Sequence, residues 1–205
     1  VPSIPLDGKT EILELRIVGG GPAATAAVTA ARQGARTAFC GAVGSDEWGR
    51  LVLDEFRREN VDTSAVAVRH GAESAVSFCW AERGSGRRSI AWARGSAAPL
   101  EPEELDFDRL KQASILHLDG HQIRAAIAAA EAVRSAGGLV SLDGGTLRPQ
   151  MLPLLESCDI AIVSEAFATA LQGGRKEPES AIETLLGRGP RIAGVTLGAR
   201  GAIAS

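Results

Sequence analysis

Apolar and polar positions alternate along most of the chain in a pattern that predicts short strands separated by helices. Four apolar runs have the length of buried strands: Ser114–Leu118, Leu139–Leu142, Ile160–Val163 and Ile192–Thr196. The segments between and after them have helical character: Gln122–Ala136, Leu147–Glu156, Glu165–Leu171 and Pro178–Leu186. Such repetition is typical of α/β proteins with a mainly parallel central sheet and helices on both faces. We therefore predict an αβα fold that forms a single domain over residues 1–205.

A glycine-rich loop opens the N-terminal half of the chain. Gly19–Gly21 precede Pro22, which suits the first position of a helix because its missing N–H would have no helical partner there. The helix should end at Gly34, and Arg36–Cys40 should form a strand that leads through a second glycine turn to a helix starting at Asp46. A glycine loop at a helix start exposes backbone N–H groups, which suit an anion or a polyhydroxylated ligand.

One segment departs from the strand–helix pattern. Ala75–Ala81 and Ser89–Ala93 are strand-like and are joined by a polar turn that contains glycine, which predicts a β-hairpin. Together with Glu11–Val18 it would form a small antiparallel sheet, a β-lid over residues 11–18 and 75–93. An ordinary edge hairpin fits the pattern equally well.

Composition narrows the class of protein. The chain is 45% hydrophobic and 23% charged with a net charge of −3, which gives no basis for nonspecific binding to nucleic acid or to a membrane. Cys40, Cys79 and Cys158 are widely spaced and lie in apolar surroundings, as expected for buried thiols in a reducing compartment. No apolar run reaches membrane-spanning length and no secretory signal is visible, so we expect a cytoplasmic protein.

Residues that can carry chemistry follow the predicted strands. They are Gly19–Thr25 after the apolar run Ile12–Val18, Asp119-Gly120-His121, Asp143-Gly144-Gly145, Ser164-Glu165 and the stretch Leu197–Gly201. Because ligands of open parallel sheets bind beyond the carboxyl ends of the strands, we expect these residues to contribute to one site. Two of them also have structural interpretations: Asp143 could cap a helix that begins near Leu147, and His121 could simply flank a helix start.

The glycine loop allows a second interpretation. Gly19, Gly21 and Ala24 match G-x-G-x-x-A after the apolar run Ile12–Val18, as in a dinucleotide-binding fold. That fold also needs an acidic residue about 20 positions later to bind the ribose. No carboxylate occurs there before Asp46. A Rossmann-type NAD(P)-dependent dehydrogenase is therefore a disfavoured alternative.

Several small residues have a spacing that resembles a known family. They are Thr25, Ala27, Gly34 and Gly44, together with G-x-V-G-x-D-x-x-G from Gly41 to Gly49 and Asn60-Val61-Asp62. This pattern resembles the first signature of the ribokinase-like (PfkB-type) carbohydrate kinases. The loop VGGGPAATAAVTAARQGA is most similar to the sulfofructose kinase type, and VSEAFATAL is similar to the ketohexokinase type. The resemblance covers essentially the whole chain.

The resemblance implies an ATP-dependent phosphotransferase that uses Mg²⁺ and acts on a hydroxymethyl group of a small sugar or sugar-like substrate. It also implies a homodimer that forms through the β-lid. A non-catalytic sugar- or nucleotide-binding relative is the alternative, because Thr25, Ser164 and Phe167 depart from the commoner family pattern. Phe167 cannot ligate a metal ion, so no metal ligand is assigned.

The resemblance also implies roles for individual residues. The expected substrate-binding residues are Gly20, Gly21, Thr25 and His121. The expected nucleotide-binding residues are Asp143, Ser164, Thr196, Gly198 and Gly201. Thr25 stands where most members have asparagine, and His121 stands where the two closest types have arginine. Histidine is mostly neutral at pH 7, so we expect it to bind a sulfonate or phosphate poorly.

The family's catalytic base is the aspartate of a Gly-Ala-Gly-Asp motif, which we expect beyond Ser205. The first strand of the family should likewise precede Val1. We therefore expect residues 1–205 to be the middle of a longer protein and to be inactive alone.

Overall fold

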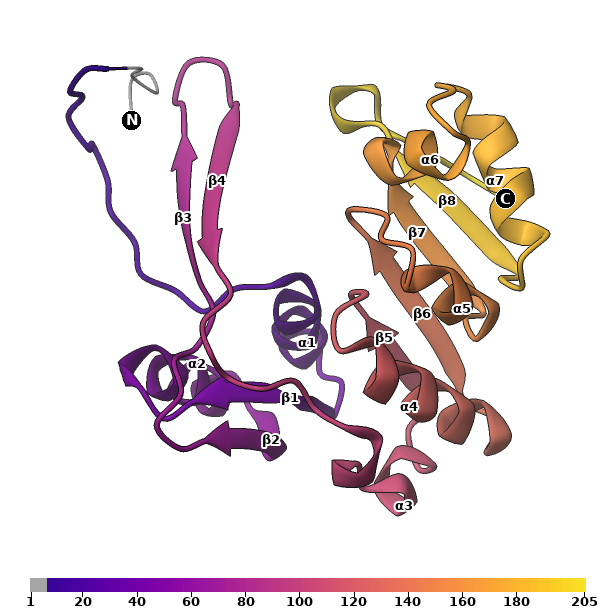
Figure 1. The fold of residues 1–205 in the computed structure, drawn as a ribbon, viewed down its shortest axis with the longest axis horizontal. Helices are drawn as coiled ribbons and strands as arrows, with labels where there is room; N and C mark the ends of the chain where they lie inside the picture. Colours follow the sequence, from indigo (N-terminus) through magenta and orange to yellow (C-terminus); the bar gives the residue numbers. More distant parts are fainter. Residues whose placement is uncertain (1–6) are drawn as a thin grey trace. The chain divides into compact units, whose positions relative to one another are not determined.

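A five-stranded sheet dominates the C-terminal half of the computed structural model, which describes residues 7–205 (Figure 1). Its strands are β5 (Ile115–Leu118), β6 (Leu139–Gly144), β7 (Ile160–Ser164), β8 (Ile192–Thr196) and β9 (Ala202–Ala204). They lie side by side in this order, β5 to β8 parallel and β9 antiparallel to β8. The structure thus confirms the α/β class with a mainly parallel sheet, and it adds β9.

The chain divides into two compact units, Val1–Pro99 and Leu100–Ser205, here called unit 1 and unit 2. The prediction of a single domain over the whole chain therefore stays a prediction. In unit 2 the helices are α3 (Phe107–Leu110), α4 (Ile123–Ser135), α5 (Met151–Glu156), α6 (Glu165–Leu171) and α7 (Pro178–Leu186). Two short 3-10 helices, η1 (Pro102–Glu104) and η2 (Gly198–Arg200), complete it.

The two faces of the five-stranded sheet differ. Side chains on one face are buried beneath the helices, as Val140, Leu142 and Val163 show with exposures of at most 1%. The alternate positions point the other way and stay exposed, including Ile115 at 55% and Ile192 at 48%. The second helical layer that the sequence predicts is therefore not formed by the helices of unit 2 in the part of the chain that the structure describes.

Unit 1 contains a smaller α/β arrangement. Its elements are α1 (Pro22–Arg32), β1 (Thr37–Gly44), α2 (Glu47–Arg58) and β2 (Val61–Arg69). The two strands pair in parallel, and the helices pack on them through Ala24, Phe56 and Val61. The rings of Phe39 and Phe56 lie 4.6 Å apart between their centroids. Strand β2 was not predicted from the sequence.

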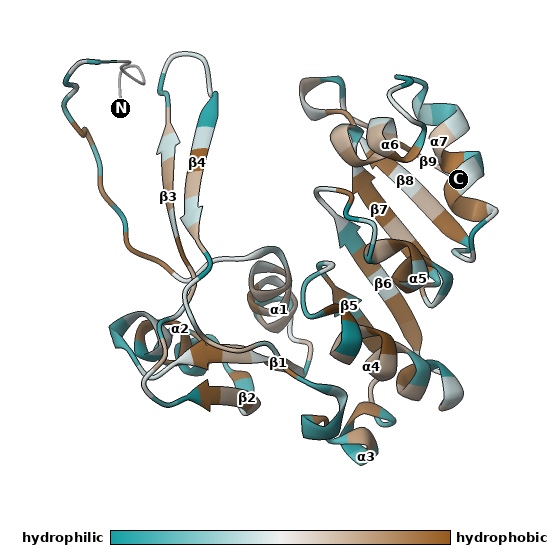
Figure 2. Ribbon diagram, viewed as in Figure 1, coloured by the Kyte–Doolittle hydropathy of each residue, from teal (hydrophilic) through white to brown (hydrophobic). Residues whose placement is uncertain are grey.

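A hairpin of two strands, β3 (Val76–Ala81) and β4 (Arg88–Ala93), forms a separate antiparallel sheet. The hairpin prediction is confirmed. The alternating apolar residues of both strands are exposed, and Figure 2 shows the resulting hydrophobic bands along them. The exposed large side chains are Phe78, Trp80, Ile90 and Trp92.

The third strand of the proposed lid is absent. Residues 11–18 form no strand, and the side chains of Leu15 and Val18 are 75% and 65% exposed. The prediction of a strand over Glu11–Val18 is therefore wrong for this chain. An alternating apolar pattern makes a strand only where a neighbour supplies backbone hydrogen bonds, and β3 and β4 pair with each other.

Among the described residues, no helix is both long and apolar enough to cross a bilayer.

Candidate active site

The carboxyl ends of four parallel strands meet at one edge of the sheet in unit 2. The register aligns Leu118 with Leu142, Gly144 with Val163, and Ser164 with Thr196. The residues after these ends are therefore brought together along that edge, as the sequence predicts: His121, Asp143, Ser164, Thr196, Gly198 and Gly201. Ligands of open α/β sheets bind at such an edge.

The turn after β8 leaves room for a ligand. Gly198 and Gly201 have φ angles of +59° and +87°, a conformation that favours glycine. A Cβ atom added to either would find no atom within 4 Å, so the space beside the turn is open. The amide of Leu197 donates to the carbonyl of Gly201 over 2.7 Å, which closes the turn. The backbone of a ligand-binding turn could thus be approached closely here.

An ion pair that the sequence did not reveal secures this turn. Arg200 Nη2 lies 2.6 Å from Glu165 Oε1 and so joins η2 to the first turn of α6. The only signal in the sequence was a pair of opposite charges at two predicted strand ends. Arg200 and Glu165 are 35 residues apart in the sequence, so the ion pair could be recognised only from the structure.

Ser164 has a structural role at this edge. Its hydroxyl accepts a hydrogen bond from the amide of Phe167 over 3.0 Å and caps α6. The same hydroxyl donates to the carbonyl of Gly145 over 2.6 Å and so ties two strand ends together. Thr196 makes only a long contact of 3.4 Å to the carbonyl of Val163. Phe167 is fully buried in the core and cannot reach a ligand.

The carboxylate of Asp143 remains uncommitted. It is half-buried at the end of β6, and in residues 7–205 it makes no hydrogen bond or ion pair. The alternative prediction, that Asp143 caps a helix beginning near Leu147, is wrong, because α5 starts at Met151 with Gln150 as its N-cap. Within the described residues no group of three His, Cys, Asp or Glu could hold a metal ion. A single carboxylate fits Mg²⁺ held largely by phosphate oxygens and water.

His121 lies in a tight turn beside an arginine. The amide of His121 donates to Asp119 Oδ1 over 3.0 Å, and its ring Nδ1 lies 3.5 Å from Arg148 Nη1. Arg148 follows the Gly144-Gly145 turn at the end of the next strand, and we did not identify it from the sequence. Its only visible signal was a basic residue close to a strand end.

The glycine loop and Thr25 belong to unit 1. Gly21 has a φ angle of +104° and is the N-cap of α1, and Thr25 is exposed one turn into that helix. A Cβ atom on Gly20 or Gly21 would meet no atom within 4 Å. The amide of Gly19 donates to a carboxylate oxygen of Glu55 on α2, which fixes the loop. Whether these residues share a cleft with those of unit 2 stays a prediction.

A hydrogen-bond network holds the second glycine turn of unit 1. Asp46 caps α2 by accepting from the amide of Gly49, and it also accepts from the hydroxyl and the amide of Ser74. Burial favours a higher pKa for Asp46, but the hydrogen bonds from Ser74 and Gly49 outweigh it and hold the pKa below its usual value. Ser74 Oγ in turn accepts from the amide of Gly44 over 2.9 Å.

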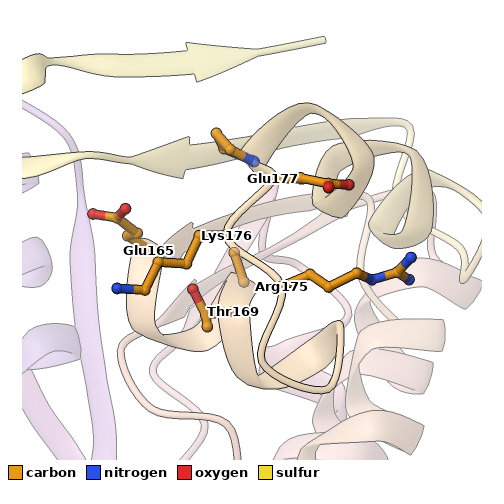
Figure 3. Close-up of a pocket in the computed structure, with 7 residues that line it drawn as sticks. Glu165, Thr169, Arg175, Lys176 and Glu177 are labelled. Carbon is orange, nitrogen blue, oxygen red and sulfur yellow. The ribbon is translucent and has the colours of Figure 1, made fainter.

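Two hollows lie near these elements. The larger has a volume of about 570 Å³ at the base of the hairpin, and it is lined by residues that include Asp46, Trp48 and Glu73. None of the predicted substrate-binding residues lines it. The smaller, between α6 and α7, encloses about 10 Å³, roughly one water molecule. In Figure 3 Lys176 extends toward the side of Glu165 and Arg175 points the opposite way. This dent is too small for a nucleotide.

The dinucleotide-binding alternative fails on local structure. Its G-x-G-x-x-A motif must follow a strand directly and open a helix. The loop does open α1, but residues 11–20 before it contain no strand. The dehydrogenase interpretation is therefore rejected.

Comparison with known proteins gives a consistent result. The sequence model of the pfkB family carbohydrate kinases matches residues 4–205. Probable fructokinase-2 of Arabidopsis thaliana is 27% identical over 205 aligned residues, covering 91% of this chain and 62% of its own. Probable fructokinase-7 of the same plant is 29% identical, covering 85% of this chain and 56% of its own. The chain thus spans less than two thirds of the length of these relatives.

Solved structures of similar proteins have the same fold as this chain. A putative ribokinase from Agrobacterium tumefaciens superposes with a TM-score of 0.84 at 26% identity, over all of this chain and 67% of its own. The ribokinase of Arabidopsis thaliana, solved with ribose and ATP, has a TM-score of 0.80 at 24% identity over 98% of this chain and 67% of its own. The ribokinase-like fold is therefore established.

Proposed function

Because the chain belongs to the pfkB family of carbohydrate kinases, we propose that the full-length protein transfers the γ-phosphoryl group of ATP to a hydroxymethyl oxygen of a small sugar or sugar-like alcohol. This reaction depends on positioning and electrostatic stabilisation more than on covalent chemistry by the protein. The fructokinases and ribokinases similar to this chain support the sugar class. The non-catalytic alternative predicts binding without turnover.

One observation carries the proposal: four strand ends converge on an edge that has an open glycine turn and an uncommitted carboxylate. ATP, when bound, supplies the phosphoryl group and its Mg²⁺ supplies positive charge at the phosphate oxygens. The Gly198–Gly201 turn lets backbone lie against the nucleotide, and Thr196 offers a hydroxyl beside it. Asp143 would hold water bound to Mg²⁺. Ser164 contributes indirectly, by fixing the position of Gly145.

On the acceptor side, Gly20 and Gly21 offer backbone and Thr25 offers a hydroxyl to the sugar. His121 is the fourth residue that we assign to the acceptor. The general base is proposed to lie outside residues 1–205, and these residues alone should then show background activity. Loss of a general base typically lowers the rate by about 10²–10⁴-fold.

The test is an assay of ADP release by full-length protein with fructose, ribose and adenosine as acceptors, beside the fragment 1–205. We expect release only when a suitable acceptor is present, because the nucleophile must be positioned before transfer. If the protein binds ATP but no acceptor stimulates ADP release, the result would favour the non-catalytic alternative. Equal rates from the fragment would place the base within residues 1–205.

We also propose that the protein is a cytoplasmic homodimer that associates through the hairpin β3–β4. Support comes from Phe78 and Trp92, which are 65% and 60% exposed on adjacent strands. Large apolar side chains clustered at a surface mark interaction sites. Analytical ultracentrifugation should show that the wild type sediments as a dimer. Trp92→Ser should raise the dissociation constant of that dimer. The wide spacing of the three cysteines in the sequence supports a reducing compartment.

A further inference from the structure

The loop before α1 is tied to the rest of unit 1 at one point. Residues 11–20 run into α1 and form no strand (Figure 1). The structure describes this whole segment, and its one hydrogen bond to another element runs from the amide of Gly19 to a carboxylate oxygen of Glu55 on α2. Gly20 and Gly21 follow directly, and a Cβ atom on either would meet no atom within 4 Å. The position of these two glycines therefore depends on the contact that Gly19 makes.

Glu55 lies on a helix that is itself held firmly. It is half-buried and precedes Phe56, which is 3% exposed in the core of unit 1. At the start of the same helix, Asp46 accepts a hydrogen bond from the amide of Gly49 and caps it. Because α2 is fixed both at its cap and in the core, Glu55 can hold the loop in one place.

The carboxylate of Glu55 has no competing partner. Within residues 7–205 it makes no ion pair, and the amide of Gly19 is its only hydrogen-bond donor. The other acidic residues at this end of α2 are paired: Asp54 with Arg57, and Glu59 with Arg32. A hydrogen bond to an ionised carboxylate is roughly twice as strong as one between neutral groups. The contact with Gly19 is therefore the one that the charge of Glu55 serves.

Gly19 and Glu55 are also in direct steric contact. A Cβ atom on Gly19 would lie 2.7 Å from Oε2 of Glu55, and the only other atom listed within 4 Å, chain neighbours aside, would be Cδ of the same side chain. Gly19 is not among the glycines with a positive φ angle, so its backbone also suits alanine. A methyl group there would push the carboxylate off the amide. The contact can thus be broken from either side.

We propose that Glu55 is a positioning residue for the acceptor. By holding the amide of Gly19, it fixes the glycine loop and the start of α1 in the arrangement that meets the hydroxyl groups of the sugar. This inference rests on the proposed function, which assigns Gly20, Gly21 and Thr25 to the acceptor. Glu55 acts through the loop and does not touch the acceptor. A loop released from Glu55 lowers the apparent affinity for the acceptor in proportion to the fraction of molecules that still have the binding arrangement.

Steady-state kinetics of the full-length protein tests this role with fructose, ribose and adenosine as acceptors. In Glu55→Ala the KM for the acceptor should rise about tenfold, as for loss of a hydrogen bond to a charged group that keeps the loop in place. The KM for ATP should stay constant. Glu55→Gln keeps an oxygen that accepts from Gly19 and should retain most of the affinity. Asp54→Ala removes a carboxylate of the same helix that is paired with Arg57, and it is the matched control with an unchanged KM.

Gly19→Ala provides a second route to the same loss. It should raise the KM for the acceptor because it displaces the carboxylate of Glu55. In combination with Glu55→Ala the two effects should not multiply, because the added methyl group then has no side chain to displace. The double variant should therefore match Glu55→Ala alone. A KM that rises by the product of the two single effects would refute the proposal. Gly19→Ala also serves if Glu55→Ala does not fold.

Calorimetry with the same three acceptors separates this proposal from the kinase assignment. If none is phosphorylated but one binds Glu55→Ala about tenfold more weakly than it binds the wild type and Asp54→Ala, the positioning role stands and the proposed transfer reaction fails. If an acceptor is phosphorylated with the same KM by the wild type and Glu55→Ala, the contact is merely structural and the positioning role is refuted. Equal weakening of ATP and acceptor refutes it as well. If none of the three binds the wild type, the loop has no acceptor to position and both proposals fail.

Discussion

The two units of the chain bury apolar surface to different degrees. In unit 2, α4 to α7 cover one face of the sheet, and Val133, Leu154 and Leu155 are completely buried. In the described part of unit 1, the buried apolar residues are Ala24, Val43, Phe56 and Val61, whereas residues 12–18 and the hairpin expose large apolar side chains.

This difference shows which unit is organised by its own core. Burial of apolar area is the main favourable term in folding, so unit 2 should hold most of the stability. The apolar surface of unit 1 is available for contact with other protein surfaces. The measurements below test this contrast, beginning with the largest expected effect.

Cysteine reactivity should separate the units most sharply. Burial in the core of unit 2 raises the pKa of Cys158 to about 12 from an ordinary 9.0. At pH 8 its thiolate fraction is then roughly a thousandfold below that of an ordinary thiol, and only the thiolate reacts. Cys40 and Cys79 of unit 1 are exposed, so the prediction of buried thiols is confirmed for Cys158 and is wrong for these two. Alkylation followed by peptide mass mapping should label these two first and Cys158 only on unfolding. Rapid native labelling of Cys158 would contradict the structure of this core.

Phe167→Ala should destabilise the protein strongly. The ring is fully buried beneath α6, and removing it leaves a cavity as well as losing apolar contact, which costs about 3–5 kcal/mol. Denaturant unfolding followed by circular dichroism measures the change. Leu15→Ala, at a side chain that is 75% exposed in unit 1, is the control and should change stability by less than about 0.5 kcal/mol. Similar losses of stability in both variants would contradict the inference that the core of unit 2 holds most of the stability.

Ser74→Ala should have an intermediate effect in unit 1. It removes a hydrogen bond to Asp46 and leaves the buried amide of Gly44 without its acceptor, which costs about 1–3 kcal/mol. The pKa of Asp46 is lowered in the folded state, so its contribution is complete above the unfolded value and is lost as pH falls through the folded value. The stability difference between wild type and variant should therefore shrink below about pH 4. A difference that does not change with pH would show that Asp46 is not involved.

Thr25→Val tests whether acceptor and nucleotide are bound by residues of different units. The change keeps the shape and removes one hydroxyl, so the KM for the acceptor should rise about twofold to tenfold while the KM for ATP stays constant. Gly198→Val, at a left-handed position beside the open turn of unit 2, should weaken ATP instead. The assignment fails if Thr25→Val weakens both ligands equally.

The strand–helix pattern predicted unit 2 well because its core positions repeat with regular periods. Errors arose where a local pattern needed a distant partner. Glu11–Val18 alternates like a strand, but among the described residues no strand pairs with it. Val61–Arg69 forms β2 because β1 pairs with it. The helix expected from Leu147 begins at Met151, since Pro149 disfavours helical backbone in the residue before it.

The candidate site was predictable only in part. Asp143, Thr196, Gly198 and Gly201 follow strands of clear pattern, so their shared edge could be inferred. Arg148 could not, because its contact with Gly120 joins residues 28 apart in the sequence and depends on the direction of a long side chain.

The placement of the tryptophans has a practical consequence. Trp48 on α2, Trp80 on β3 and Trp92 on β4 are the three tryptophans of the chain, which has no tyrosine. Intrinsic emission of residues 1–205 excited at long ultraviolet wavelengths therefore originates entirely in unit 1. Loss of the large core in unit 2 would go unseen by that signal, whereas far-ultraviolet dichroism, which detects its helices, would register it. If the unfolding transitions followed by fluorescence and by dichroism differ, the two units unfold separately. Coincident transitions would indicate that they unfold together.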